Sequence, residues 1–141
     1  MATVSRSVIV PHPAARMFAL VDDVESYPRF LPWCSGTKVL ERTGEVTRAR
    51  LEIDYHGLKS HFTTLNRKDA PHSMDLDLVE GPFDRLKGRW TFTPLGEEGS
   101  RVELTLDYEL ASKSMDRLLA PVFGYIMATL VDRFVARAEE S

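Results

Sequence analysis

The chain has 141 residues, of which 43% are hydrophobic and 28% are charged. This length is typical of a single domain, residues 1–141, and this balance excludes a disordered or low-complexity chain. The net charge is −3, and because affinity for nucleic acid rises with the number of phosphates that a protein neutralises, we expect no DNA binding. The single cysteine, Cys34, excludes an internal disulfide and favours a reducing compartment.

The first thirty residues predict one strand followed by two short helices. Residues 4–10 mix β-branched and polar side chains, as strands do, and the prolines that follow end the strand. Residues 14–21 repeat apolar side chains every three or four positions, which predicts a short helix. A second short helical segment is expected near residues 26–30.

Between residues 34 and 110, apolar and polar side chains alternate, which predicts about six strands. Antiparallel hairpins would join them into one sheet with a single apolar face. The pair His56-Gly57 is typical of a two-residue hairpin turn. The other breaks between strands are expected at residues 43–45, 67–71, 81–82 and 94–100.

Residues 113–139 place apolar side chains along one stripe of a long helix, and Pro121 is expected to kink this helix or delay its start. Such a helix can cover the apolar face of the sheet. We therefore predict an α+β fold in which a curved antiparallel sheet of about seven strands wraps around a long C-terminal helix. We also expect the sheet to be too large for one helix to cover. The remaining apolar space would suit a ligand if it reaches roughly 300 Å³.

Motifs that carry catalysis or bind metals are not evident. No base near Cys34 is recognisable that would activate its thiol, and Asp22-Asp23 favours capping of the next helical turn. We therefore predict no catalytic residue and no metal site. The histidines lack metal-ligand spacing and are expected at turns or on the polar face; they are His12, His56, His61 and His72.

The basic residues Arg85, Lys87 and Arg89 form a short run on the polar face of one expected strand. They could bind RNA. We favour an ion-pair lattice with acidic residues of the neighbouring strands, such as Asp75 and Asp77, because opposite charges across strands stabilise pairing.

Residues 27–34 combine four large apolar side chains with two prolines, and prolines stiffen the chain. Two interpretations stay open. The segment could plug one end of the sheet, or it could form the mouth of a ligand cavity. In the second case Phe83, in the turn at residues 80–83, could face Trp33 across the opening.

The chain carries five short motifs in a fixed order: Tyr27-Pro28-x-Phe30-Leu31-Pro32-Trp33-Cys34, Gly57-Leu58, Glu80-Gly81-Pro82-Phe83, Trp90-x-Phe92-x-Pro94-Leu95 and Pro121-Val122-Phe123. Together they resemble those of the coenzyme Q-binding, START-like (polyketide cyclase/dehydrase) family, over about residues 4–138. The resemblance implies a helix-grip fold with a hydrophobic tunnel between the sheet and the long helix. It implies ubiquinone binding in support of respiration in some members, and in a toxin branch binding of the large ribosomal subunit, which blocks subunit association.

Three functional hypotheses follow. The first is non-catalytic binding of a hydrophobic ligand, ubiquinone or another prenyl lipid, with transient membrane contact as a further expectation. The second is association with the large ribosomal subunit. The third, a cyclase-like enzyme, is disfavoured because the expected inward positions are almost all apolar, whereas acid–base catalysis needs titratable groups.

We expect no cofactor other than ubiquinone as a ligand, and a bacterial, cytoplasmic protein, because no signal peptide, transit peptide or membrane-spanning run is evident. One of three tyrosines, at positions 27, 55 and 108, could donate a hydrogen bond to a quinone carbonyl. The expected ligand-binding residues are Tyr27, Phe30, Leu31, Trp33, Tyr55, Phe62, Met74, Leu76, Leu78, Phe83, Trp90, Phe92, Tyr108, Leu119, Phe123, Ile126 and Leu130.

Overall fold

The structure, a computed structural model, describes residues 2–140, without the side chains of residues 115 and 116. One sheet carries all seven strands, in the order β1-β7-β6-β5-β4-β3-β2, and every neighbouring pair is antiparallel. The elements in chain order are β1 (Ala2–Val10), α1 (Ala14–Asp22), the 3₁₀ turn η1 (Val24–Ser26), α2 (Tyr27–Phe30), β2 (Cys34–Arg42), β3 (Val46–Tyr55), β4 (Leu58–Asp69), β5 (Ser73–Glu80), β6 (Phe83–Leu95), β7 (Gly99–Leu110) and α3 (Lys113–Glu140).

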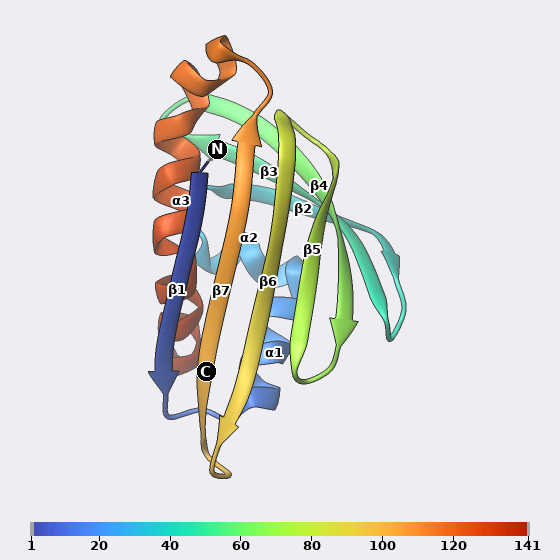
Figure 1. The fold of residues 1–141 in the computed structure, drawn as a ribbon, viewed down its shortest axis with the longest axis vertical. Coiled ribbons are helices and arrows are strands. Elements are labelled where there is room, and N and C mark those ends of the chain that lie inside the picture. Colours follow the sequence, from blue (N-terminus) through green and yellow to red (C-terminus); the bar gives the residue numbers. More distant parts are fainter. Residues whose placement is uncertain (1, 141) are drawn as a thin grey trace.

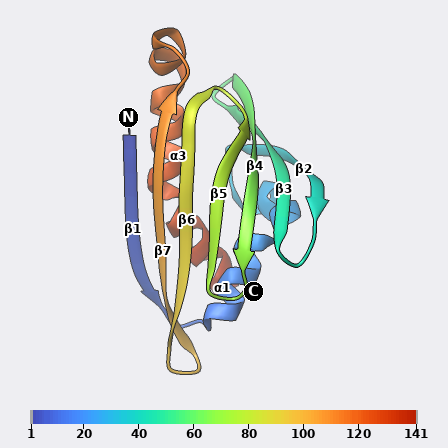
Figure 2. The same cartoon turned by 45° about the vertical axis from the view of Figure 1, so that its right-hand side comes forward.

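The sheet curves around the helices, so the predicted helix-grip arrangement is confirmed. Figures 1 and 2 show α1, α2 and α3 on the same, concave side of the sheet, with α3 running along β1 and β7. Alternation explains which residues reach this side. In β7 the five apolar residues from Val102 to Leu110 are buried at every second position, whereas the residues between them are not buried. On α3, the side chains of Phe123, Ile126 and Phe134 are each at most 1% exposed.

Two predicted turns are shorter than expected. β4 continues to Asp69, so Arg67 is a strand residue paired with Asp75 rather than part of a turn. β6 continues to Leu95, with Pro94 opposite Ser100. In both places the neighbouring strand is long enough to supply a pairing partner. Charged or turn-forming residues therefore lie within a paired strand. The predicted hairpin at His56-Gly57 is confirmed, and both residues have positive φ angles, 52° and 81°.

Pro121 neither delays nor interrupts α3, which is continuous from Lys113 to Glu140. A proline has no N–H to donate to the carbonyl four residues earlier, so the helix lacks one backbone hydrogen bond at this point. The stretch Arg117–Glu140 is long and apolar enough to span a membrane by length and composition, since a window of 18 residues within it has a mean hydropathy of 1.5. Its apolar side chains instead supply the cover of the sheet.

The convex face of the sheet carries the predicted ion-pair lattice. Arg89 lies opposite Asp75 in the register, with 3.6 Å between Nη1 and Oδ1. Lys87 lies opposite Asp77, with 3.9 Å between Nζ and Oδ1, and Arg67 pairs with the same carboxylate. These cations are therefore engaged with acidic neighbours, which argues against a basic patch for RNA along β6.

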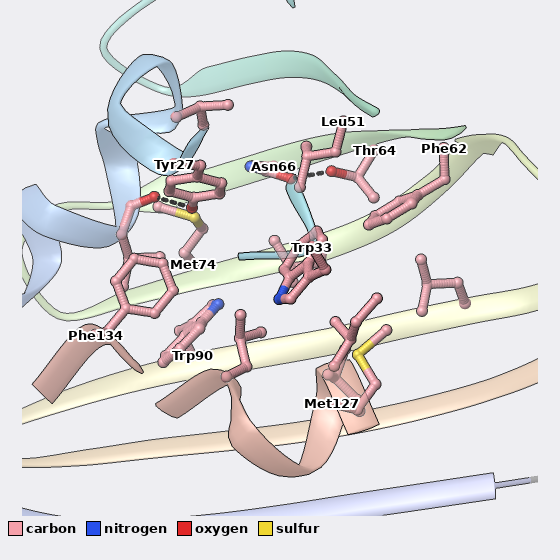
Figure 3. A pocket seen from close by; sticks show the side chains of 17 residues that line it. Tyr27, Trp33, Leu51, Phe62, Thr64, Asn66, Met74, Trp90, Met127 and Phe134 are labelled. Carbon is pink, nitrogen blue, oxygen red and sulfur yellow. Dashed lines mark hydrogen bonds between the residues drawn. The ribbon is translucent and has the colours of Figure 1, made fainter. Parts of the chain in front are cut away.

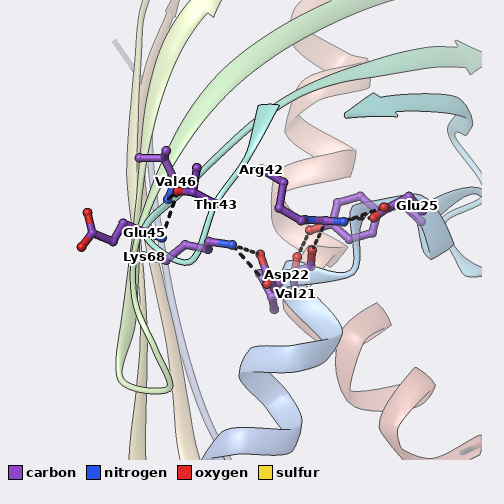
Figure 4. Close-up of polar contacts among 9 residues, drawn as sticks. Val21, Asp22, Glu25, Arg42, Thr43, Glu45, Val46 and Lys68 are labelled. Carbon is purple, nitrogen blue, oxygen red and sulfur yellow. Dashed lines mark hydrogen bonds and ion pairs between the residues drawn. The ribbon is translucent and has the colours of Figure 1, made fainter. Parts of the chain in front are cut away.

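A second group of polar contacts ties the helical segment to the sheet (Figure 4). The Arg42 guanidinium donates to both Glu25 carboxylate oxygens, at 2.6 and 2.9 Å, and to the Asp22 carbonyl oxygen at 3.0 Å. The Lys68 side chain is only 5% exposed, and its Nζ atom lies 3.2 Å from Asp22 Oδ1. Asp22 thus pairs with a buried lysine on β4, and the capping role predicted for it is wrong.

The Glu25–Arg42 pair makes stability depend on pH. Hydrogen bonding to Arg42 lowers the pKa of Glu25 below its ordinary value of 4.5. A carboxyl whose pKa is lowered by folding adds stability above its ordinary pKa and loses it as pH falls through the folded-state pKa. The Glu25→Gln variant should therefore lower the free energy of unfolding by under about 1 kcal/mol near pH 7, because the pair is exposed.

The difference between this variant and the unsubstituted protein should vanish at a pH below the lowered folded-state pKa of Glu25, where the carboxyl is protonated in both the folded and unfolded states. Urea unfolding at the two pH values measures this difference. Glu98→Gln, an exposed glutamate in the β6–β7 turn, serves as the control. A difference of the same size at both pH values would contradict the assignment.

Candidate functional site

A cavity lies between the concave face of the sheet, α3 and the aromatic segment 27–34 (Figure 3). Its volume is about 70 Å³. The side chains that line it are mostly aliphatic or aromatic, and Thr64 and Asn66 are the polar exceptions apart from the tyrosine and tryptophans. The 17 lining residues are Val21, Val24, Tyr27, Trp33, Leu51, Phe62, Thr64, Asn66, Met74, Leu76, Leu86, Trp90, Leu106, Ile126, Met127, Leu130 and Phe134.

The predicted tunnel is not open in this structure. A volume of about 70 Å³ is well below the roughly 300–1,000 Å³ that ligand pockets occupy. Large side chains from the aromatic segment 27–34 reduce the space that remains under the sheet. Trp33 is 2% exposed and Leu31 is 1% exposed, so the segment expected to be either a plug or a mouth fills space beneath the sheet and forms one wall of the cavity.

Aromatic contacts frame the cavity. Phe134 of α3 packs edge-to-face against Trp90, with ring centroids 5.5 Å apart, and against Tyr27, at 5.3 Å. Trp90 in turn stacks on Phe92 at 5.9 Å. Edge-to-face and offset-stacked rings add to the stability gained from burial alone. These contacts hold the end of the cavity near α2 in one arrangement.

A glycine helps to create the hollow in the sheet. Gly88 lies on β6 between Leu76 of β5 and Leu106 of β7, and both leucines line the cavity. A Cβ atom at this position would collide with the side chain of Leu106. Because Gly88 has no side chain, the Leu106 side chain can extend over β6.

Eight of the predicted ligand-binding residues line the cavity and nine do not. The eight are Tyr27, Trp33, Phe62, Met74, Leu76, Trp90, Ile126 and Leu130. The remaining predicted residues lie elsewhere in or around the core; they are Phe30, Leu31, Tyr55, Leu78, Phe83, Phe92, Tyr108, Leu119 and Phe123.

Some of these nine form a second aromatic cluster at the other end of the core. Phe83 packs against Phe123 with centroids 4.8 Å apart, and against Phe62 and Tyr108 at 6.0 and 6.1 Å. Phe83 therefore closes the core beside α3 and, unlike Trp33, is not part of the cavity wall. Tyr55 stacks on Tyr125 of α3 at 5.1 Å.

The lining residues that sequence reasoning missed are of two kinds. Thr64 and Asn66 are polar, and an alternation rule assigns polar residues of a strand to the exposed face. The signal that could have found them is their spacing from Phe62, since residues two and four positions along share its face. The others are apolar. The sequence patterns placed five of them on apolar faces without linking them to a ligand, namely Val21, Leu51, Leu86, Leu106 and Phe134, and they did not assign Val24 or Met127.

Both hydroxyl groups at the cavity already have a partner within the protein. The Tyr27 hydroxyl donates to the Val21 carbonyl oxygen, and burial raises the pKa of this phenol. The Thr64 hydroxyl donates to Asn66 Oδ1 at 2.7 Å. Among the described lining residues, Trp33 Nε1 is the one buried side-chain polar atom without a hydrogen-bond partner.

The arrangement offers little for catalysis. Tyr27 is the one titratable side chain among the described lining residues, and its proton is held by Val21. Cys34 is buried, and desolvation raises the pKa of its thiol to about 11, which keeps it protonated and unreactive near neutral pH. No group of three His, Cys, Asp or Glu side chains within the described part of the chain could hold a metal ion.

Comparison with known proteins agrees with this architecture. The family model for polyketide cyclase / dehydrase and lipid transport matches residues 10–135. The ribosome association toxin RatA of Escherichia coli K12 is 40% identical over 140 residues, covering 99% of this chain and 89% of the toxin.

More distant similarities point the same way. A mitochondrial coenzyme Q-binding protein of Schizosaccharomyces pombe is 28% identical over 141 residues, covering 94% of this chain and 84% of that protein. The crystal structure of the Zhui aromatase/cyclase from Streptomyces sp. R1128 has a TM-score of 0.83 and covers 98% of this chain and 93% of its own, at 20% identity. The last similarity concerns the fold alone.

Proposed function

The chain belongs to the polyketide cyclase / dehydrase and lipid transport family, and from this we propose that it binds a hydrophobic ligand of the prenyl lipid kind, such as ubiquinone, without transforming it. The observation that carries the proposal is the apolar cavity between the sheet and α3. Every CH₂ group that leaves water for such an environment contributes about 0.8 kcal/mol. A prenyl tail therefore needs no charged partner for retention.

Binding rather than catalysis suits the lining of the cavity. General acid–base catalysis needs a group that can exchange a proton with the substrate, and the Tyr27 proton is committed to the Val21 carbonyl. The similarity to an aromatase/cyclase extends to the backbone, whereas catalysis depends on side chains. The similarity to a coenzyme Q-binding protein supports a quinone as the ligand.

The cavity must expand to hold such a ligand, and two features favour expansion. Met74 and Met127 line opposite walls, and methionine side chains adapt readily to new shapes. The second feature is the uneven attachment of α3. Its C-terminal half is held by Arg6–Asp132 at 2.7 Å, by His12–Glu139 at 3.2 Å and by Arg16, which donates to the Ala138 carbonyl oxygen at 2.9 Å.

The N-terminal half of α3 covers the sheet with apolar side chains such as Leu119 and Phe123. It also contains Pro121, where the helix lacks a backbone hydrogen bond. We infer that ligand entry displaces residues 113–124 while residues 128–140 stay in place.

Ligand binding can be tested with a matched pair of variants on β5. Leu76 lines the cavity and Leu78 does not, yet both are partly buried. Leu76→Phe should narrow the cavity and weaken ubiquinone binding by about tenfold or more, whereas Leu78→Phe should change it by less than about twofold. Titration with a short-chain ubiquinone, followed by tryptophan fluorescence, measures both. Equal effects of the two variants, or no binding to the unsubstituted protein, would refute the proposed site.

Movement of α3 can be tested by amide hydrogen exchange. Amides of residues 113–124 should exchange faster than those of residues 128–138 in the free protein. Pro121 removes one backbone hydrogen bond near the first group, whereas polar contacts at Asp132 and Ala138 hold the second. Bound ubiquinone should slow exchange in the first group more than in the second. Uniform protection along α3 in both states would exclude this route of entry.

A second candidate function is association with the ribosome. It is favoured by the 40% identity to the RatA toxin over 99% of this chain. This function and ligand binding do not exclude each other, since a partner would contact the outer surface and a ligand the interior. Overexpression in Escherichia coli should deplete 70S ribosomes in favour of free subunits on sucrose gradients. An unchanged 70S peak at a confirmed high protein level would exclude it, and the Leu76→Phe variant shows whether the cavity is required.

A further inference from the structure

We propose that the Trp33 indole donates a hydrogen bond to a carbonyl oxygen of the ligand, so that the cavity selects neutral, apolar molecules that carry such an oxygen. The inference rests on the proposed ligand-binding function and adds the group that orients the ligand. Its basis is the Trp33 Nε1 atom, which is buried, lines the cavity and has no hydrogen-bond partner within the protein.

The backbone around Trp33 fixes the position of this donor. The Asp54 amide of β3 donates to the Trp33 carbonyl oxygen at 3.0 Å, and the Cys34 amide donates to the Leu31 carbonyl oxygen at 3.0 Å. Both bonds tie the turn between α2 and β2 to the sheet. Trp33 is 2% exposed, and Figure 3 shows its indole among the other cavity side chains, with the nitrogen on the side that faces Trp90.

A buried N–H group without a partner is costly, which is why nearly all buried donors are paired. The two hydroxyl groups at this site could accept a hydrogen bond from the Trp33 N–H, but in this arrangement they do not. The Tyr27 hydroxyl is directed at Val21, and the Thr64 hydroxyl at Asn66. Water that enters the cavity could bond to Trp33, and a ligand that displaces it must supply an equivalent acceptor to avoid losing affinity.

The chemistry of the lining defines the class of ligand. Indole N–H is a donor only, so the ligand must offer an acceptor. A hydrocarbon would leave Trp33 unpaired, and a protonated amine, which is also a donor only, would be repelled. None of the 17 described lining residues carries a charged side chain. A carboxylate or phosphate would therefore be buried without a counter-charge, which is strongly unfavourable. A ketone, quinone or ester oxygen on an apolar molecule satisfies both conditions.

Two probes with the same tail isolate this hydrogen bond: 2-decyl-1,4-benzoquinone, which has carbonyl oxygens, and decylbenzene, which has none. The chain contains two tryptophans, so its ¹H–¹⁵N spectrum shows two indole N–H signals, which the Trp33→Phe variant assigns. Binding of the quinone should move the Trp33 signal to higher proton frequency, as a new hydrogen bond does, and decylbenzene should not. Backbone amide signals of the β6–β7 turn, which does not line the cavity, provide an internal reference in the same spectrum of the unsubstituted protein.

Affinities of two variants complete the test. Trp33→Phe should weaken the quinone about five- to tenfold more than it weakens decylbenzene, which is the range expected for one neutral hydrogen bond. Phe62→Leu changes another aromatic residue of the same cavity without removing a donor, and it should weaken both probes alike. Calorimetry gives these values independently of tryptophan fluorescence.

The outcomes separate the two proposals. If the unsubstituted protein binds both probes and Trp33→Phe weakens them equally, the role of Trp33 is overturned and the ligand-binding function stands. If neither probe binds the unsubstituted protein, the ligand-binding function itself fails, and the inference about Trp33 fails with it.

Discussion

The need to cover one concave, apolar sheet face governs this molecule. Seven antiparallel strands turn their alternate apolar residues toward the same side, and an exposed face of that size would be unstable in water. A single long helix, α3, covers the part of the sheet formed by β1 and β7 (Figure 2). The rest requires the short helices and the aromatic segment 27–34, whose prolines hold large side chains in place at little entropic cost.

The same constraint explains where the cavity lies and why it is small. Straight helices cannot follow a strongly curved sheet along its whole surface. Some space therefore remains where α3, α2 and β4–β6 meet. Large aromatic side chains, among them Trp33, Trp90 and Phe134, enter this space and line what is left of it. Close packing here favours a stable empty form, and the adaptable Met74 and Met127, together with the proline in α3, provide the means to enlarge it. A site of this kind can be stable without its ligand and still accept one.

Sequence patterns predicted the elements well where one periodicity applied over a long stretch. β7 alternates without a break from Val102 to Leu110, and α3 keeps its apolar stripe through Pro121. The weakest prediction concerned β4, because Thr64, Asn66 and Lys68 follow Phe62 on the concave side. Polar residues face inward there for reasons that alternation does not reveal: Lys68 meets Asp22 across the fold, and Asn66 accepts a hydrogen bond from Thr64.

The content of the site was less predictable than its location, and the reason is physical. Cavity volume is a small difference between the space under the sheet and the summed volumes of the side chains that enter it, so one indole decides whether a tunnel is open or closed. Hydrogen-bond partners are equally non-local. The sequence suggested tyrosines as donors to a ligand, yet Tyr27 is bonded to Val21 six residues earlier, and the unpartnered donor is Trp33. Which donor remains free depends on contacts between distant segments, and in the binding role proposed for the cavity that detail selects the ligand.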